Sequence, residues 1–351
     1  MKISTEALGA CPVPQNRYEQ IVLGHGSGGR LSADLLKQIF LPELGNAVLS
    51  KLEDQATVPF GNARLAFTTD AFVVRPPFFP GGDIGKLAVC GTVNDLAVGG
   101  AKPLFLSAAF ILEEGLPTAD LARIVASFRE TCAAAGVTMI AGDTKVVDRG
   151  KADQIFITTS GIGIVPDGLS LSISGARPGD KVILSGTLGD HGMAVMSVRE
   201  GLEFETELKS DCAPLHDLTR LMLETCSEIR CMRDPTRGGL ATALNELAAA
   251  SGVGVRIDER LIPVRREVIA ACEILGFDPV YVANEGKLIA VVPASEAKRL
   301  VEAMRTHPLG QDAAVIGEIL MERPGIVSMK SIAGGERVVT MLTGEQLPRI
   351  C

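Results

Sequence analysis

Residues 65–100 read LAFTTDAFVVRPPFFPGGDIGKLAVCGTVNDLAVGG and contain three kinds of local pattern in a row. The run 65–69 predicts a strand that delivers Asp70 at its end. A turn rich in proline and glycine then holds Asp83, and residues 86–99 predict a helix. A strand, a turn and a helix in this order indicate an α/β fold.

The same alternation continues through this half of the chain. Strands are predicted at 104–112, 136–141 and 155–165, and a helix N-capped by Thr118 lies between the first two. The middle strand ends on a Gly-Asp-Thr-Lys turn at 142–145. These elements are sufficient for one compact domain.

A second domain is predicted after a break in composition. Residues 166–180 are rich in Ser, Gly and Pro, and strands and helices alternate again beyond them. A chain of 351 residues is long enough for two domains of ordinary size. We therefore predict a mobile N-terminal extension (1–20), an N-terminal domain (21–165), a linker (166–180), a C-terminal domain (181–343) and a mobile tail (344–351).

Composition and charge exclude several classes of protein. Hydrophobic residues make up 46% of the chain and charged residues 22%, which is typical of a soluble globular protein. A formal net charge of −8 argues against nucleic acid or an anionic membrane as the main partner. The first twenty residues lack the apolar segment of a signal peptide, so we expect a cytoplasmic protein in which the eight scattered cysteines form neither disulfides nor a zinc site.

Four aspartates predict a metal site in the first domain. Asp70, Asp83, Asp95 and Asp143 are placed at strand ends, in a glycine turn or on the helix 86–99, where one rim could collect them. Each aspartate alone is more commonly a turn or cap residue. Together, on a chain without a Walker lysine, they predict a carboxylate cluster that holds Mg²⁺ against nucleotide phosphates.

Two glycine-rich segments are candidates for phosphate contacts. His25, Gly26, Ser27, Gly28 and Gly29 precede a helical pattern, so their backbone amides could wrap an anion, although a flexible hinge would have the same composition. The segment 233–240, RDPTRGGL, is either a second set of phosphate or substrate contacts or a simple turn and helix cap.

The last eight residues, GEQLPRIC at 344–351, end on a cysteine. A segment that starts at glycine and contains proline resists helix formation, and eight extended residues reach roughly 26 to 29 Å. Such a tail could carry the thiol of Cys351 into a pocket. A frayed terminus with an incidental cysteine is the competing interpretation.

Taken together, the motifs resemble the HypE family of nickel–iron hydrogenase maturation proteins, within the superfamily of aminoimidazole ribonucleotide synthetase. The resemblance runs from about His25 to Cys351. It is carried by HGSGG at 25–29, FFPGG at 78–82, GKLA at 85–88, GDTK at 142–145, TLGDHG at 187–192, TRGG at 236–239, NEGK at 284–287 and PRIC at 348–351.

This resemblance implies a two-domain synthetase-like fold with mixed sheets, and an ATP-dependent dehydratase whose substrate is its own C-terminus. In that family the carbamoyltransferase HypF loads a carbamoyl group onto the terminal cysteine, here Cys351. Removal of water leaves a thiocyanate, and the cyano group passes to iron on a HypC–HypD scaffold. The resemblance also implies a homodimer with ATP in a cleft bounded by the two domains.

The resemblance assigns expected roles to individual residues. Cys351 would carry the reacting group, and Glu285 is the candidate base, with His191 or a water as the alternatives. Lys145 would polarise or orient the carbamoyl group, and His191 could otherwise be an accessory. Lys145 could equally be a counter-charge for phosphate. The expected ATP contacts are His25, Gly26, Ser27, Gly28, Gly29, Asn94, Thr144 and Arg237, and the expected Mg²⁺ ligands are Asp70, Asp83, Asp95 and Asp143.

Two other functions stay open at this point. One is a small-molecule kinase or synthetase of the same superfamily, in which the tail is idle. The other is a non-catalytic thiol carrier that binds nucleotide only to dock a partner.

Overall fold

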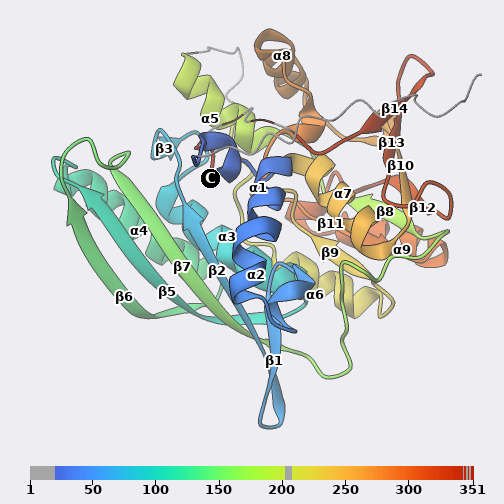
Figure 1. The fold of residues 1–351 in the computed structure, drawn as a ribbon, viewed down its shortest axis with the longest axis horizontal. Helices are drawn as coiled ribbons and strands as arrows, with labels where there is room; N and C mark the ends of the chain where they lie inside the picture. The colour runs from blue at the N-terminus through green and yellow to red at the C-terminus, as the bar shows by residue number, and fades with distance from the viewer. Residues whose placement is uncertain (1–19, 202–207, 343, 345–346, 348) are drawn as a thin grey trace, which may run out of the picture.

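The computed structural model describes residues 20–201, 208–342, 344, 347 and 349–351. It contains two mixed sheets, each packed against helices, and the chain ends between them (Figure 1). The predicted mixed α/β fold is confirmed. The predicted N-terminal extension lies outside the described residues except for Gln20.

The N-terminal sheet has five strands in the order β1-β2-β7-β5-β6, and only β5 and β6 are parallel. A helix, α3 (Ile84–Val98), packs across β2 and β7 and is buried along almost its whole length. A second helix, α4 (Thr118–Ala134), packs on α3. The strands are β1 (Ala56–Phe60), β2 (Ala63–Phe72), β5 (Lys102–Glu113), β6 (Thr138–Val147) and β7 (Ile155–Val165).

Large apolar side chains lie exposed on the strands of this sheet. On the edge strand β6, Ile140 is 58% exposed and Val146 is 67% exposed. Phe67 on β2 and Phe105 on β5 are also exposed. An apolar surface of this kind is typical of a contact with another protein.

The second sheet has seven strands in the order β14-β13-β10-β12-β8-β11-β9, and only β10 and β13 are parallel. Its strands are β8 (Lys181–Leu184), β9 (Cys231–Arg233), β10 (Gly254–Asp258), β11 (Ile289–Val292), β12 (Ala314–Leu320), β13 (Val327–Lys330) and β14 (Glu336–Val339). Its helices are α5 (Asp190–Glu200), α6 (His216–Thr225), α7 (Gly239–Ser251), α8 (Arg266–Leu275) and α9 (Ala294–Met304).

Short elements complete the chain. Before the first sheet lie α1 (Arg30–Leu35), a π-helical turn η2 (Leu36–Phe40) and α2 (Leu41–Leu44), none of which has a buried residue. A two-stranded ribbon joins β3 (Phe78–Phe79) to β4 (Gly82–Asp83). Five 3-10 turns are η1 (Leu23–Gly26), η3 (Leu49–Lys51), η4 (Glu259–Leu261), η5 (Pro279–Tyr281) and η6 (Pro308–Gly310).

The two domains share a hydrophobic core. One cluster of buried side chains joins Leu87 and Val93 of α3 to Met193 of α5 and Val268 of α8, and it also includes Ile350 of the tail. The tail is therefore packed into the body of the protein. Within the part of the chain that the structure describes, no helix is both long and apolar enough to cross a membrane.

Several predicted boundaries were wrong. Residues 142–145 lie inside β6 instead of following a strand, and Asp70 lies inside β2. Long-range pairing explains both differences, because β5 and β7 offer partners beyond the apolar runs. Thr118 is the first helical residue of α4, and Pro117 occupies the N-cap position without a side-chain cap.

Candidate active site

A cluster of three aspartates lies where the two domains meet. Asp54 precedes β1, Asp95 is on α3 and Asp234 follows β9, and one carboxylate oxygen from each lies within 4.8 Å of the others. Thr68 donates a hydrogen bond of 2.6 Å to Asp95, and Arg233 Nε lies 3.1 Å from Asp54. These contacts hold the acidic groups together.

The cluster carries more negative charge than its surroundings neutralise. Burial raises the pKa of Asp95 well above its ordinary value, and the charges of Asp70, Asp234 and Asp54 raise it further. Burial also raises the pKa of Asp234 to about 6. Converging hard oxygen donors with raised pKa values fit a divalent cation such as Mg²⁺. Asp54, Asp95 and Asp234 would hold it, with Asp70 adding charge nearby.

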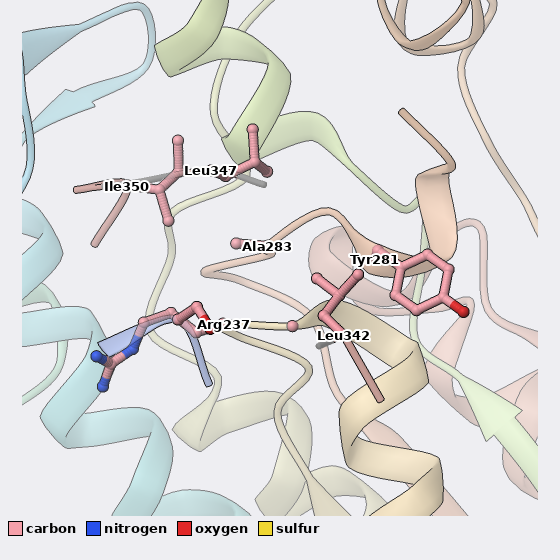
Figure 2. A pocket seen from close by; sticks show the side chains of 8 residues that line it. Arg237, Tyr281, Ala283, Leu342, Leu347 and Ile350 are labelled. Atoms are coloured by element: carbon pink, nitrogen blue, oxygen red, sulfur yellow. The ribbon is translucent and has the colours of Figure 1, made fainter. Parts of the chain in front are cut away.

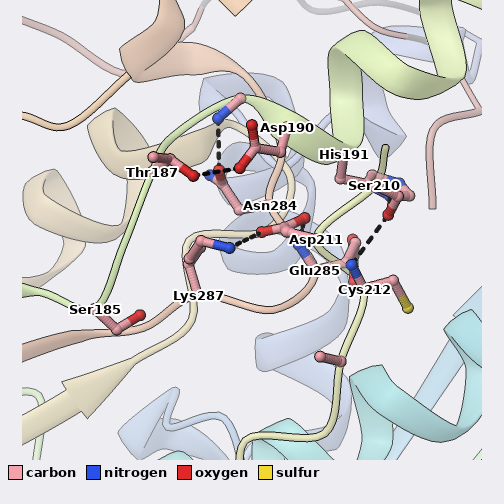
Figure 3. A network of polar contacts seen from close by, with 12 residues as sticks. Ser185, Thr187, Asp190, His191, Ser210, Asp211, Cys212, Asn284, Glu285 and Lys287 are labelled. Carbon is pink, nitrogen blue, oxygen red and sulfur yellow. Dashed lines mark hydrogen bonds and ion pairs between the residues drawn. The ribbon is translucent and has the colours of Figure 1, made fainter. Parts of the chain in front are cut away.

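The NEGK segment places Glu285 beside this cluster. The Asn284 side chain accepts a hydrogen bond from Gly189 N at 2.8 Å (Figure 3). It also donates one to Pro235 O at 3.0 Å. Asp211 accepts a bond from Glu285 N at 3.1 Å and pairs with Lys287 at 3.2 Å. The ends of the segment are therefore fixed by three separate loops.

Gly286 explains why this segment approaches Asp211 so closely. A Cβ atom at Gly286 would lie 1.9 Å from the backbone oxygen of Asp211. This distance is too short for any residue with a side chain, so the position requires glycine. Although burial alone would raise the pKa of Asp211, the Lys287 ammonium holds it below its ordinary value. Asp211 therefore stays negatively charged and holds the backbone of Glu285 through the hydrogen bond from Glu285 N.

The Glu285 carboxyl group is buried and reaches the tail thiol. Its side chain is 3% exposed, and its Oε1 has no hydrogen-bond partner among the described residues. Burial raises the pKa of Glu285 well above its ordinary value, and Cys212 and nearby aspartates raise it further. The Cys351 thiol lies close enough to the Glu285 carboxyl group to interact with it, and the Arg237 guanidinium lies close enough to interact with both. A raised pKa makes Glu285 a stronger base once it is ionised.

The glycine-rich loop closes over Arg237. Arg237 Nη1 donates a hydrogen bond of 3.0 Å to Gly26 O. Gly28 has a φ of +72°, and a Cβ atom there would lie 2.7 Å from Arg237 O, so the position requires glycine. The pocket beneath the loop is lined by Ser27, Arg237, Gly238, Tyr281, Ala283, Leu342, Leu347 and Ile350 (Figure 2).

Some residues predicted for the site have other contacts in this chain. Asp83 caps α3 by accepting from Gly85 N at 2.7 Å. The Asn94 side chain accepts a hydrogen bond from Leu215 N at 2.8 Å and donates one to Ala213 O at 3.1 Å. It therefore joins the two domains instead of facing a ligand.

The other predicted residues do not belong to the aspartate cluster of their own chain. Asp143 and Lys145 pair at 2.7 Å on the exposed strand β6, with Thr144 between them. His25 bonds within its own loop, through Val22 N at 3.0 Å. His191 contacts the tail backbone instead of the thiol. Their predicted roles in metal binding, nucleotide binding and catalysis stay predictions.

Sequence reasoning missed Asp54 and Asp234 as members of the acidic cluster. Asp234 had a signal, because it follows the buried strand β9 within the RDPTRGG motif that was already singled out. Asp54 had none beyond its place before a strand. Asp95 and Asp234 are 139 positions apart in the sequence, so their proximity follows only from the packing of the domains.

Comparisons with known proteins agree over nearly the whole chain. Models of the N-terminal and C-terminal domains of AIR synthase related proteins match residues 52–165 and 177–330. The carbamoyl dehydratase HypE of Azotobacter vinelandii is 55% identical over 335 residues, which cover 95% of this chain and 98% of that protein.

Solved structures extend this likeness. A HypE–HypF complex matches with a TM-score of 0.83 and 49% identity, covering 88% of this chain and 99% of that one. The hydrogenase maturation protein HypE in complex with ATP matches with a TM-score of 0.80 and 46% identity, covering 95% of this chain and 100% of that one. The predicted synthetase-like fold is confirmed.

Proposed function

Since the chain belongs to the HypE family of carbamoyl dehydratases, we propose that it dehydrates a carbamoyl group carried on its own Cys351. The balanced reaction is protein-S-C(O)NH₂ + ATP → protein-S-C≡N + ADP + phosphate. The thiocyanate would supply the cyanide ligand of the hydrogenase iron. The observation that carries this proposal is the inserted tail: Cys351 O accepts from Val73 N at 3.2 Å, and the Cys351 thiol lies close enough to the buried carboxyl group of Glu285 to interact with it.

Glu285 has the properties of the base. An amide oxygen leaves poorly, so the carbamoyl oxygen must first become a phosphate ester, and bound ATP supplies the phosphoryl group. The carbamoyl nitrogen loses one proton when its oxygen is phosphorylated, and Glu285 takes the remaining proton as the carbon–oxygen bond to the leaving phosphate breaks. The Oε1 atom of Glu285 is buried and has no hydrogen-bond partner among the described residues, so it can accept that proton away from bulk water. Arg237 supplies positive charge beside the same thiol.

ATP and Mg²⁺ are the expected cofactors. A related HypE has been solved with ATP, which supports nucleotide binding here. The aspartate cluster would hold Mg²⁺, whose charge would neutralise the nucleotide phosphates. The glycine loop contacts Arg237 and lines one pocket with Leu347 and Ile350 of the tail. The amides of Ser27 and Gly28 donate to Gly24 O and Ser32 Oγ, so a nucleotide phosphate would have to replace these bonds to use them.

The proposal includes three partners. HypF would carbamoylate Cys351, and the solved HypE–HypF complex of a relative supports this. A HypC–HypD scaffold would accept the cyanide. A second copy of this chain would cover the exposed apolar side chains of β6, and that dimer could bring Lys145 and Asp143 of one chain to the site of the other.

Mass spectrometry of the C-terminal peptide tests the reaction. After incubation with the carbamoyltransferase, carbamoyl phosphate and ATP, the peptide that contains Cys351 should gain one carbamoyl group and then lose one water. Withholding Mg²⁺ and ATP after loading should stop the sequence at the carbamoyl adduct. A carbamoyl group on another cysteine, or an adduct that never loses water, would contradict the proposal.

The Mg²⁺ assignment predicts a change in thermal stability. The wild-type melting temperature should rise by several degrees at saturating Mg²⁺, because a ligand that binds only the native state stabilises it. Asp95→Asn should melt higher than wild type in EDTA, because it removes one of several repelling buried charges, and should lose most of the Mg²⁺ response. Differential scanning calorimetry measures both.

The exposed Asp217 on α6 provides the control, since Asp217→Asn should keep the full Mg²⁺ response. An equal response in all three proteins would place the metal elsewhere.

A further inference from the structure

The body of the protein holds the tail by its backbone. Arg349 O accepts hydrogen bonds from Arg75 N at 3.1 Å and from the Arg199 guanidinium at 2.7 Å. Ile350 O accepts from His191 at 2.8 Å, and Cys351 O accepts from Val73 N at 3.2 Å. Each of the last three carbonyl oxygens therefore has a donor from the body.

The two side-chain donors are themselves fixed. A carbonyl oxygen can only accept, so His191 carries its proton on Nε2, and its Nδ1 accepts from Ser210 Oγ at 2.8 Å. Phe79 packs edge-on against the imidazole, with ring centroids 5.3 Å apart. Arg199 Nε also donates to Arg75 O at 2.9 Å, which ties the guanidinium to the segment after β2 that the tail is hydrogen-bonded to.

The side chains of the tail add two further contacts. Ile350 is 2% exposed and lies in the core that both domains share. The Arg349 guanidinium forms a two-oxygen ion pair with Asp153, at 2.8 and 2.9 Å. These contacts leave the Cys351 thiol within interaction range of Glu285.

We propose that Arg199 and His191 are positioning residues that hold the tail inserted and so set the place of the Cys351 sulfur against Glu285. This inference rests on the proposed function. Because the two residues bind carbonyl oxygens and not the thiol, they can hold the free, carbamoylated and cyanated forms of Cys351 alike. Chemistry at the sulfur then proceeds without disturbing the contacts that orient it.

Alkylation of Cys351 reports tail insertion independently of the reaction. Iodoacetamide attacks an exposed thiolate far faster than a half-buried thiol, which is what Cys351 is in the inserted tail. Arg199→Ala removes a charge-assisted hydrogen bond to the tail, so the Cys351 peptide should be alkylated about tenfold faster than in wild type. Arg199→Lys keeps the charge with fewer donors and should give an intermediate rate. Arg220→Ala, on the exposed face of α6, should match wild type.

A second variant keeps the test decisive if Arg199→Ala does not fold. Asp153→Asn leaves Arg199 intact but weakens the ion pair with Arg349, and it should also raise the alkylation rate severalfold. A wild-type alkylation rate in folded Arg199→Ala, or in His191→Ala if Arg199→Ala does not fold, would overturn the proposal.

His191 variants separate positioning from proton transfer. His191→Gln retains an amide donor for Ile350 O but cannot act as an acid or base at neutral pH, whereas His191→Ala has no donor. Positioning predicts slow alkylation and near wild-type single-turnover dehydration of the preloaded chain for His191→Gln, and faster alkylation for His191→Ala. Equal losses of dehydration in both, with wild-type alkylation, would instead make His191 a proton-transfer residue.

The two proposals fail in different ways. If the loaded wild-type peptide never loses water, the proposed function is wrong, whatever the alkylation rates are. If wild type loses water but Arg199→Ala and Arg220→Ala are alkylated equally slowly, only the positioning role is wrong.

Discussion

Cys351→Ala should abolish carbamoylation and cyanide formation completely while ATP binding stays as in wild type. The reaction uses the sulfur of Cys351 as the atom that carries the carbamoyl group, and no neighbouring group can replace it. Isothermal titration calorimetry measures nucleotide binding, and intact-mass spectra after incubation with the carbamoyltransferase measure loading. Cys351 contributes a half-buried thiol to the site, so its loss should leave the fold unchanged.

The control for this variant is Cys272→Ala, which removes a buried thiol from α8 and should load and dehydrate normally. The competing functions give other results. A small-molecule kinase would keep its turnover after deletion of residues 348–351. A non-catalytic thiol carrier would load Cys351 but release no phosphate from ATP. Loading of Cys351→Ala at another cysteine would contradict the self-modification directly.

Glu285→Gln should slow dehydration by about 10²–10⁴, the usual contribution of a general base, and leave the carbamoylated chain to accumulate. Glutamine has the same shape but accepts no proton, so the segment 284–287 and its contacts with Asp211 should persist. Single-turnover measurements on preloaded protein separate this step from loading. The exposed residue Glu273 on α8 provides the matched control, and Glu273→Gln should react at the wild-type rate.

The pH profile gives this variant a second signature. Burial raises the pKa of Glu285, so its carboxyl group becomes a base only as the pH rises through that raised pKa. The wild-type rate should therefore increase with pH until Glu285 is ionised, and Glu285→Gln should lose that dependence. An unchanged rate in the variant would assign proton removal to another group or to water.

Local patterns in the sequence predicted most of the elements. The predicted helix at 86–99 corresponds to α3, and the predicted strands at 104–112 and 155–165 correspond to β5 and β7. Such elements are set by the apolar periodicity and the flanking glycines, which act over a few residues. The predicted boundaries were wrong where a strand continues along a distant partner, as at residues 142–145 in β6.

The candidate site was only partly predictable. Glu285, Arg237 and Cys351 were each predicted for the site from a short motif, and the structure places them close enough to interact. Their roles as base, ATP contact and reacting group stay predictions. Asp95 was predicted for the acidic cluster, whereas Asp54 and Asp234 were not. Asp83 has a local role as a helix cap, which agrees with the ordinary preference of aspartate for that position.

The sequence by itself determined the α/β class, the family and the motifs that hold the reacting residues, since all three depend on the order of residues along short segments. Only the tertiary structure decided which aspartates converge, that His191 binds the tail backbone, and that the tail is inserted with Ile350 in the shared core. These features join residues more than a hundred positions apart. Their proximity comes from the packing of two domains against each other, which no local pattern encodes.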